Sequence, residues 1–165
     1  MIPENHWCLF AAAPVGRIDL ARWTQQALSL VRAEITLEQR LTDPDGLLPA
    51  VASLGSTLRP TGDTATPTRV HVQTYPLTEM PAVRAAGERA AAAIGGAGMD
   101  ALVARATRAW LIAATPGGAG DARAPLALAA VMAGVLLAPI VPPEGGVIFG
   151  LKGARARLEA LGWRT

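Results

Sequence analysis

Residues 109–128 read AWLIAATPGGAGDARAPLAL. The apolar run Ala109–Ala114 leads into a glycine-rich loop, and an apolar helix is expected to start at Pro125. A strand followed by a loop and a helix is the repeating unit of α/β folds, and many proteins bind a phosphate group at such a junction. The stretch therefore predicts an α/β fold and raises the question of whether its loop holds an anion.

Strand and helix patterns alternate along the rest of the chain. The strands expected from apolar runs and from period-two alternation are Trp7–Ala12, Arg69–Tyr75, Ala109–Ala114 and Gly146–Gly150. Helices are expected after the capping residues Asp19, Thr78, Asp100 and Asp121, and near Gly153–Leu161. The stretch Ile35–Leu41 either continues the first helix or forms a further strand, and the turn Asp43-Pro44-Asp45-Gly46 ends it in both cases.

Strands separated by helices favour a sheet with helices on its faces. We therefore predict a single α/β domain over residues 1–165, with a four- or five-stranded, mostly parallel or mixed sheet. An irregular loop is expected at about 55–68, where two prolines, two glycines and five threonines gather. This loop is the one stretch whose composition is typical of a lid or an interaction arm.

No charged residue occurs between positions 124 and 143. Pro125 and Pro139 limit the apolar helix in this stretch to roughly 13 residues, or about 20 Å, whereas a membrane span needs about 20 helical residues. The stretch thus predicts a buried core helix and no membrane span.

Hydrophobic residues make up 51% of the chain, and the mean hydropathy is +0.30. Much of this excess is alanine, and only seven residues are aromatic, counting four Trp, two Phe and one Tyr. A monomer of this size has difficulty hiding so much apolar surface, and the exposed remainder usually marks an interface. The composition therefore predicts a homo-oligomer or a subunit of a larger assembly.

The charge and the cysteine content of the chain limit the classes of binding partner and the cellular compartments that we expect. The net charge is +2, and of the 15 Lys and Arg residues only Lys152 is a lysine. Basic residues form no consecutive run and do not interleave with aromatic ones, so no nucleic-acid binding is expected. Cys8 is alone, which excludes an intrachain disulfide, and the N-terminal stretch lacks the pattern of a signal peptide. Together these features favour a cytoplasmic location.

The glycine-rich loop has three interpretations: a tight turn, a cradle for an anion or cofactor, and a contact with another chain. Its spacing matches neither a dinucleotide-binding nor a P-loop pattern, and Asp121 would repel an anion, so the turn is favoured. If the loop does bind, its free amides, Arg123 and Lys152 would hold the anion. The residues assigned to this ligand site are Thr115, Gly117, Gly118, Gly120, Arg123 and Lys152.

The remaining reactive side chains give weaker signals. His6 and Cys8 share one face of the first strand, but their spacing is poor for a nucleophile with its base, so Cys8 is expected in the core. His71 lies on the polar face of its strand; it is either part of an open ligand or partner surface or, as we favour, half-buried beneath a helix. No histidine, cysteine or carboxylate spacing predicts a metal site, and no cofactor or catalytic residue is assigned.

Two functions follow from these observations. The preferred one is a non-enzymatic structural or protein-interaction subunit, for example a phage-like or secretion-machine component or an inhibitor or immunity-type protein. The alternative is a small α/β enzyme or ligand-binding domain that holds an anionic group at residues 115–121, with the loop at 55–68 closing over it. Parallel strands would bring residues 76–78, 115–121 and 151–153 together at one sheet edge.

Overall fold

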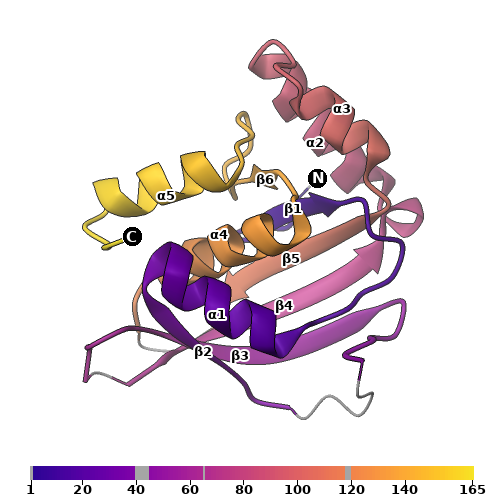
Figure 1. Ribbon diagram of the computed structural model, residues 1–165. Helices are drawn as coiled ribbons and strands as arrows, with labels where there is room; N and C mark the ends of the chain where they lie inside the picture. The colour runs from indigo at the N-terminus through magenta and orange to yellow at the C-terminus, as the bar shows by residue number, and fades with distance from the viewer. Residues whose placement is uncertain (1, 40–44, 65, 118–119) are drawn as a thin grey trace.

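The computed structural model describes residues 2–39, 45–64, 66–117 and 120–165. These residues form one α/β domain around a six-stranded sheet in the order β2-β3-β4-β5-β1-β6 (Figure 1). The strands are β1 (Trp7–Ala11), β2 (Ala33–Leu37), β3 (Ala52–Pro60), β4 (Thr68–Pro76), β5 (Arg108–Ala114) and β6 (Ile140–Val141). The helices are α1 (Leu20–Val31), α2 (Pro81–Ala93), α3 (Met99–Arg105), α4 (Ala124–Leu136) and α5 (Leu151–Ala160), with a 3-10 turn, η1 (Leu77–Glu79), before α2.

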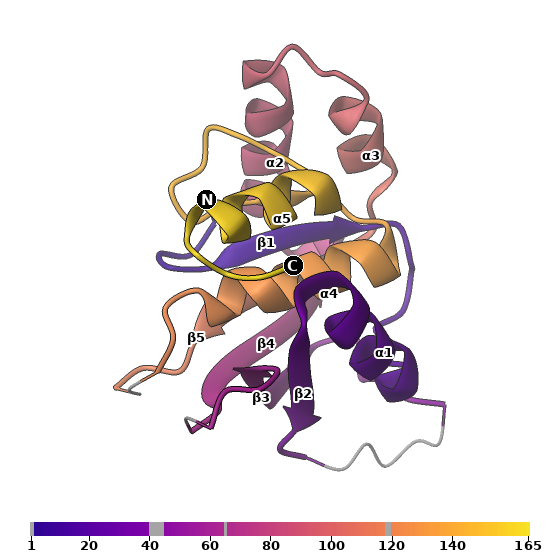
Figure 2. The ribbon, with the colours of Figure 1, turned by 60° about the vertical axis from the view of Figure 1, so that its left-hand side comes forward.

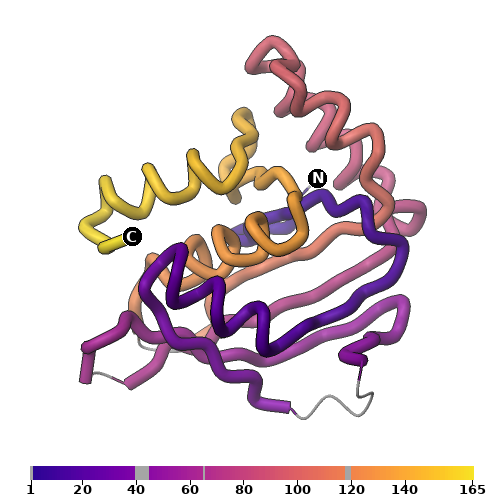
Figure 3. The backbone as a smooth tube through the Cα atoms, viewed as in Figure 1, coloured from indigo at the N-terminus to yellow at the C-terminus, as the bar shows by residue number. Residues whose placement is uncertain are grey.

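Every strand pair in the described part of the chain is antiparallel, so the expectation of a mostly parallel or mixed sheet with four or five strands is wrong. The main reason is the connection between β4 and β5. In Figure 3 the chain leaves β4, passes out through α2 and comes back through α3. This helical pair returns the chain to the end it left, because Pro76 of β4 pairs with Arg108 of β5. A single helix would have carried it to the opposite end and made the strands parallel.

Single-helix crossovers do occur, but they join strands that are not neighbours. The pairing order gives β1 and β2 the same direction, with α1 between them in sequence and β5, β4 and β3 between them in the sheet. Likewise β5 and β6 run the same way, joined through α4, with β1 inserted between them. The predicted alternation of strands and helices is therefore confirmed, but the strands that a single helix joins are not neighbours in the sheet.

Two segments differ from their predicted structure. The stretch expected to be irregular from about 55 belongs to β3 as far as Pro60, where Leu54, Ser56 and Leu58 turn one buried face to the core. Instead of a strand at Gly146–Gly150, the last strand is β6, to which Phe149 adds one bridge at Ile140. The alternation that starts at Ile35 does mark a strand, β2, which spans Ala33–Leu37. The end of that predicted stretch at Leu41 and the first half of the predicted turn, Asp43 and Pro44, lie outside the described residues.

Three of the predicted helix caps are also wrong. Asp19 caps α1 as expected, since its carboxylate accepts the N–H of Arg22 at 3.1 Å. The caps of α2, α3 and α4 are instead Met80, Gly98 and Arg123, which form no side-chain capping bond. In their place Pro81 opens α2 and Pro125 lies in the first turn of α4, where a missing N–H costs nothing.

The helix α4 is the centre of the larger core. Its residues from Ala124 to Ala133 are all buried, as the charge-free stretch predicted. It lies on one face of the sheet between α1 and α5, which both pack against it (Figure 1). No helix of the described residues is long and apolar enough to cross a membrane.

The second face of the sheet is covered over one half only. There α2 and α3 pack over β1 and β5, where Phe10 and Leu111 are buried in a smaller core. Figure 2 shows both helices well away from β2 and β3. The corresponding face of β2, β3 and β4 carries polar side chains that pair across the strands: Arg59 with Glu34, Arg69 with Glu38, and Ser53 with His71. This half of the sheet has the inward-apolar, outward-polar alternation of an antiparallel sheet that faces water.

Arg108 is a buried cation that holds three segments together. Only 3% of the residue is exposed, and its guanidinium donates to the carbonyls of Ala50 (2.7 Å) and Pro14 (3.3 Å) and to Thr74 Oγ1 (3.2 Å). Burial lowers the pKa of Arg108, while the nearby charge of Glu79 opposes this effect. The side chain thereby fixes the segments before α1 and before β3 against the end of β4.

The packing of α2 on β1 predicts an unusual response to a small substitution. A glycine within a helix normally destabilises by roughly 0.5–1 kcal/mol relative to alanine. A methyl group at Gly87, however, would come within 2.5 Å of Cζ of the buried Phe10. We therefore expect Gly87→Ala to lower the free energy of unfolding by about 1–3 kcal/mol in urea denaturation, because the core is already full. Glu88→Ala at the exposed neighbouring position is the control, and a Gly87→Ala variant more stable than the native protein would contradict this packing.

Candidate functional site

The glycine-rich loop after β5 lies beside the start of β4. Ala114 pairs with Val70, and the N–H of Thr115 donates to the carbonyl of Arg69 at 3.2 Å. A Cβ at Gly120 would meet Thr68 Oγ1 at 2.7 Å, so glycine is needed there for close packing on β4. Gly118 lies outside the described residues, and Gly117, with φ of 73°, is exposed. The glycines thus have a structural reason, in line with the tight turn that the spacing favours.

A hollow of about 430 Å³ adjoins this loop, and its chemistry suits an anion poorly. Thr115 and Gly120 of the predicted ligand site line it, together with Arg69 and Asp121. Arg69 is already paired with Glu38 at 2.8 Å. The guanidinium of Arg123 bonds the carboxylate of Asp121 and lowers its pKa, which keeps a negative charge in the wall.

The predicted site residues do not converge. Residues 76–78 lie at the other end of β4 from the loop, as the antiparallel register requires. Lys152 is exposed on α5 and lines a separate hollow with Arg155 and Glu159. The prediction that residues 76–78, 115–121 and 151–153 meet at one edge is therefore wrong, because it depended on parallel strands.

Arg123 is the one predicted residue that belongs to a well-built polar site. Its Nε and Nη2 donate to the two carboxylate oxygens of Asp121 at 2.8 and 2.6 Å, and its Nη1 donates to the carbonyl of Leu161 at 3.2 Å. The guanidinium carbon lies 5.0 Å from the ring centre of Trp163, a cation–π distance. Arg123 thus connects the end of the glycine-rich loop to the C-terminal segment.

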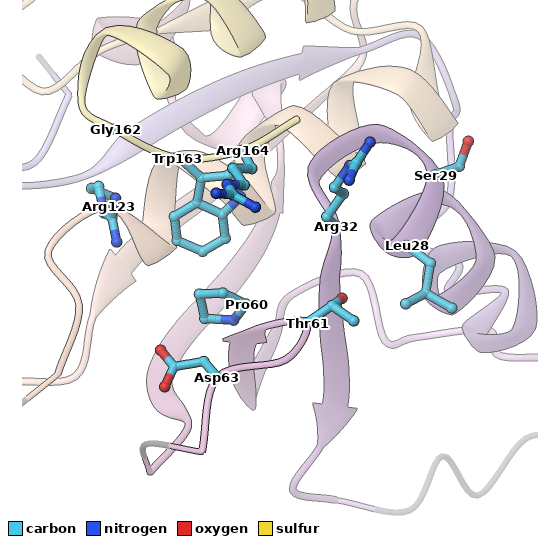
Figure 4. A pocket seen from close by; sticks show the side chains of 10 residues that line it. All are labelled: Leu28, Ser29, Arg32, Pro60, Thr61, Asp63, Arg123, Gly162, Trp163 and Arg164. Carbon is cyan, nitrogen blue, oxygen red and sulfur yellow. The ribbon is translucent and has the colours of Figure 1, made fainter.

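On the far side of this connection is a pocket of about 680 Å³, which we call the arginine pocket (Figure 4). The end of α1, the tip of the β3–β4 hairpin, the residue before α4 and the C-terminal segment form its walls. Its lining residues are Leu28, Ser29, Arg32, Pro60, Thr61, Asp63, Arg123, Gly162, Trp163 and Arg164. Three of these ten side chains are guanidinium groups and one is a carboxylate.

The backbone at the junction of α1 and β2 places Arg32 in the pocket. Arg32 ends α1 in the left-handed conformation, with φ of 47° and ψ of 52°. Its carbonyl accepts the N–H of Thr61 at 2.8 Å, which draws the β3–β4 hairpin against the end of α1. Within the described residues neither Arg32 nor Arg164 lies in an ion pair, in contrast to Arg123.

Trp163 anchors the C-terminal wall. Its indole N–H donates to the carbonyl of Val31 at 2.6 Å, which satisfies one of the unpaired carbonyls at the C-terminal end of α1. Only 4% of Trp163 is exposed. Figure 4 shows its ring between Arg123 and Arg164, and Figure 2 shows the C-terminal segment beside the start of β2. This bond fixes residues from opposite ends of the chain around one cavity.

Asp63 makes one side of the arginine pocket less positively charged than the other. The hydrogen bonds that Arg123 donates to the carboxylate of Asp121 are the largest influence that raises the pKa of Arg123, and the charge of Asp63 adds to it from the hairpin tip. Asp63 and Arg123 therefore lie within each other's electrostatic field, and Figure 4 shows the carboxylate on the Arg123 side of the pocket. Arg32 and Arg164 supply the remaining positive charge of the lining, which exceeds the negative charge of Asp63.

Of this site, the sequence indicated only Arg123 and the neighbourhood of Asp63, which belongs to the predicted loop at 55–68. Arg32, Arg164 and Trp163 were missed because residues more than one hundred positions apart meet here, through bonds such as that from the indole of Trp163 to the carbonyl of Val31. The strong preference for arginine over lysine is a property of the whole chain and does not indicate which arginines gather.

The cysteine and the two histidines do not line the arginine pocket. Cys8 is fully buried, and burial raises the pKa of its thiol, which confirms the expected place in the core. His6 lies before β1 and contacts the carbonyl of Glu4 through Nδ1 at 2.8 Å. His71 is half-buried and hydrogen-bonded to Ser53 Oγ at 2.8 Å, but on the open half of the sheet and not beneath a helix. Among the described residues, no three His, Cys, Asp or Glu side chains gather in a way that would hold a metal ion.

Comparisons of the chain with protein-family models, with curated proteins and with solved structures gave no match. The functional interpretation therefore rests on the pocket itself.

The Asp121–Arg123 pair predicts a pH-dependent contribution to stability. Because the folded protein lowers the pKa of Asp121 below its ordinary value of 3.8, the pair stabilises the fold above that pH and loses its effect as the pH falls further. The pair is partly exposed, so we expect Asp121→Asn to cost about 1–2 kcal/mol at pH 7. The difference from the native protein in urea denaturation should shrink towards zero near pH 2, while Glu88→Gln on α2 shows no such trend. An equal difference at pH 3 and pH 7 would exclude this role of the carboxylate.

Proposed function

We propose that this protein is a ligand-binding domain that holds a small anionic molecule in the arginine pocket. The observation that carries the proposal is the pair Arg32 and Arg164, two guanidinium groups that line one cavity and lie in no ion pair within the described residues. Guanidinium groups present parallel N–H donors that match phosphate and carboxylate oxygens. A pocket of about 680 Å³ also falls within the usual range for small-molecule sites.

The rigidity of the surroundings supports the same proposal. Arg123 is held by Asp121, by the Leu161 carbonyl and by the ring of Trp163. Trp163 is itself held by the Val31 carbonyl. A site whose walls are fixed in advance loses little conformational entropy when its ligand binds. The wall of the pocket formed by Arg123 and Trp163 is thus preorganised.

The location of the apolar residues in the structure reverses our preference between the two functions inferred from the sequence. The high hydrophobic content was the main reason to prefer an assembly subunit. Many of these residues are instead buried in the two cores of the domain, among them those of α4, which packs between the sheet, α1 and α5. The composition therefore gives less support to an interface than it did alone, and the anion-binding alternative becomes the better one.

Binding is favoured over turnover by the groups that the pocket offers. Its described lining contributes guanidinium groups, the hydroxyls of Ser29 and Thr61, and the carboxylate of Asp63. Guanidinium groups keep their protons at physiological pH and so serve as binding donors and not as bases. We accordingly place the ligand-binding role before an enzymatic one.

Isothermal titration calorimetry with inorganic phosphate and with pyrophosphate tests the proposal. We expect the native protein to bind at least one of them, and Arg32→Gln and Arg164→Gln each to weaken binding about tenfold or more, because each removes charge-assisted hydrogen bonds. Arg89→Gln, on the exposed side of α2, is the matched control and should leave the affinity unchanged. Binding should also weaken with added salt. The absence of binding by the native protein, or equal affinities for all three variants, would overturn the proposal.

A second candidate function, self-association or assembly with other subunits in the cytoplasm, is favoured by one exposed apolar surface. Val15, Leu47 and Val51 are 40–47% exposed. They lie on two segments held side by side, since the N–H of Leu48 donates to the carbonyl of Gly16 and Arg108 bonds both Pro14 and Ala50. A group of large apolar side chains at one end of a sheet is a common feature of protein interfaces.

Light scattering across a concentration series tests this second candidate. We expect a mass above 17.0 kDa that falls on dilution, and a dissociation constant raised about tenfold by Val51→Ser because the substitution removes buried apolar area. Leu137→Ser, at an exposed position after α4, should leave the association unchanged. A mass of one chain at every concentration would exclude self-association.

A further inference from the structure

We infer that the anion held in the arginine pocket is the phosphate group of a phosphorylated sugar or similar polyol, whose hydroxyl groups face Asp63. This inference rests on the proposed function, because it names the class of ligand for the same pocket. It derives from the unequal charge of the two sides of the cavity and from the small exposed area of its aromatic ring.

The positive side suits a phosphate monoester. Arg32 comes from the end of α1 and Arg164 from the C-terminal segment, so the two arginines line the cavity from different elements (Figure 4). A carboxylate has two oxygens and is satisfied by one guanidinium fork, whereas a phosphate monoester offers three terminal oxygens. Two guanidinium groups that line one pocket therefore match the oxygens of a phosphate better than those of a carboxylate.

The other side suits a neutral hydrogen-bond donor. A carboxylate such as Asp63 has about four lone-pair positions, so it accepts hydrogen bonds from a ligand in addition to those within the protein. Its negative charge disfavours a second phosphate at this side, which argues against bisphosphates. Arg123, although it is paired with Asp121, already places a positive charge near Asp63, so the carboxylate does not need a ligand ammonium group as its partner. A neutral hydroxyl group donates to the carboxylate without bringing either charge.

The aromatic and apolar surfaces of the pocket argue against a nucleotide. A base would need an open ring face on which to stack, yet Trp163 is 96% buried and Arg123 already lies over its ring. The apolar surface that remains comes from Pro60 and from Leu28, which is 46% exposed. These side chains can contact the C–H groups of a sugar, while the hydroxyls of Ser29 and Thr61 add donors and acceptors around it.

Calorimetric titration with four matched probes tests the inference: glucose 6-phosphate, glucosamine 6-phosphate, inorganic phosphate and glucose. We expect glucose 6-phosphate to bind about tenfold more tightly than inorganic phosphate, through added hydrogen bonds to its hydroxyls. It should also bind more tightly than glucosamine 6-phosphate, which replaces one hydroxyl by an ammonium group. Glucose alone should show no measurable binding.

Asp63→Asn separates the role of the carboxylate from that of the pocket as a whole. We expect it to strengthen the binding of inorganic phosphate, since it removes a negative charge, and to reduce the preference for glucose 6-phosphate over phosphate by at least about threefold. Arg89→Gln should leave both affinities unchanged, and the circular-dichroism melting curve of each variant verifies that it is folded.

The outcomes distinguish this inference from the proposed function. If phosphate and glucose 6-phosphate bind equally well and Asp63→Asn does not alter their ratio, the pocket binds anions without recognising a polyol, and the inference is overturned alone. If glucosamine 6-phosphate binds most tightly, Asp63 selects an ammonium group, and the inference is again overturned. If no phosphate-bearing probe binds the native protein, the proposed anion-binding function itself falls.

Discussion

The fold depends on the burial of α4 against the sheet. This helix is apolar on all sides, so a position at the surface of the protein would leave a large area of alanine, leucine and valine side chains in water. The structure covers it with the sheet on one side and with α1 and α5 on the others. Both ends of the chain contribute to this cover, and the place where they meet is the arginine pocket. The constraint that stabilises the core thus also determines where a polar cavity forms.

The sequence predicted local structure well wherever one pattern dominated. The period-two alternation of Arg69–Tyr75 and the charge-free stretch after Pro125 both gave elements close to those observed. The strand directions predicted from the sequence were wrong, because the direction of a strand depends on how many helices the connection before it contains and on how they pack. The pair α2 and α3 returns the chain to its starting end, and Gly87 permits this arrangement by letting α2 approach Phe10 closely. Nothing in the pattern of either helix alone specifies that return.

The site was less predictable than the fold for a related reason. Arg123 was identified because a glycine-rich loop precedes it, but the residues that line the arginine pocket with it come from the end of α1, the β3–β4 hairpin and the C-terminal segment. Arg32 follows a helix whose last carbonyls need donors, and Trp163 supplies one through its indole N–H. Such a bond is specified by three-dimensional packing and leaves no periodic signal in the sequence. The glycines that drew attention to the loop are explained by the contact of Gly120 with Thr68.

The arrangement of charges in the arginine pocket is difficult to explain by stability alone. Among the described residues Arg59, Arg69 and Arg157 lie close to a glutamate, and Arg84 and Arg155 donate to backbone carbonyls. Arg32 and Arg164 are both exposed, and they line one concave surface. Arg32 does so from a left-handed backbone position, which costs a residue other than glycine roughly 1–2 kcal/mol. Glycine would relieve this strain, so an arginine at this position makes physical sense when a ligand of opposite charge occupies the cavity.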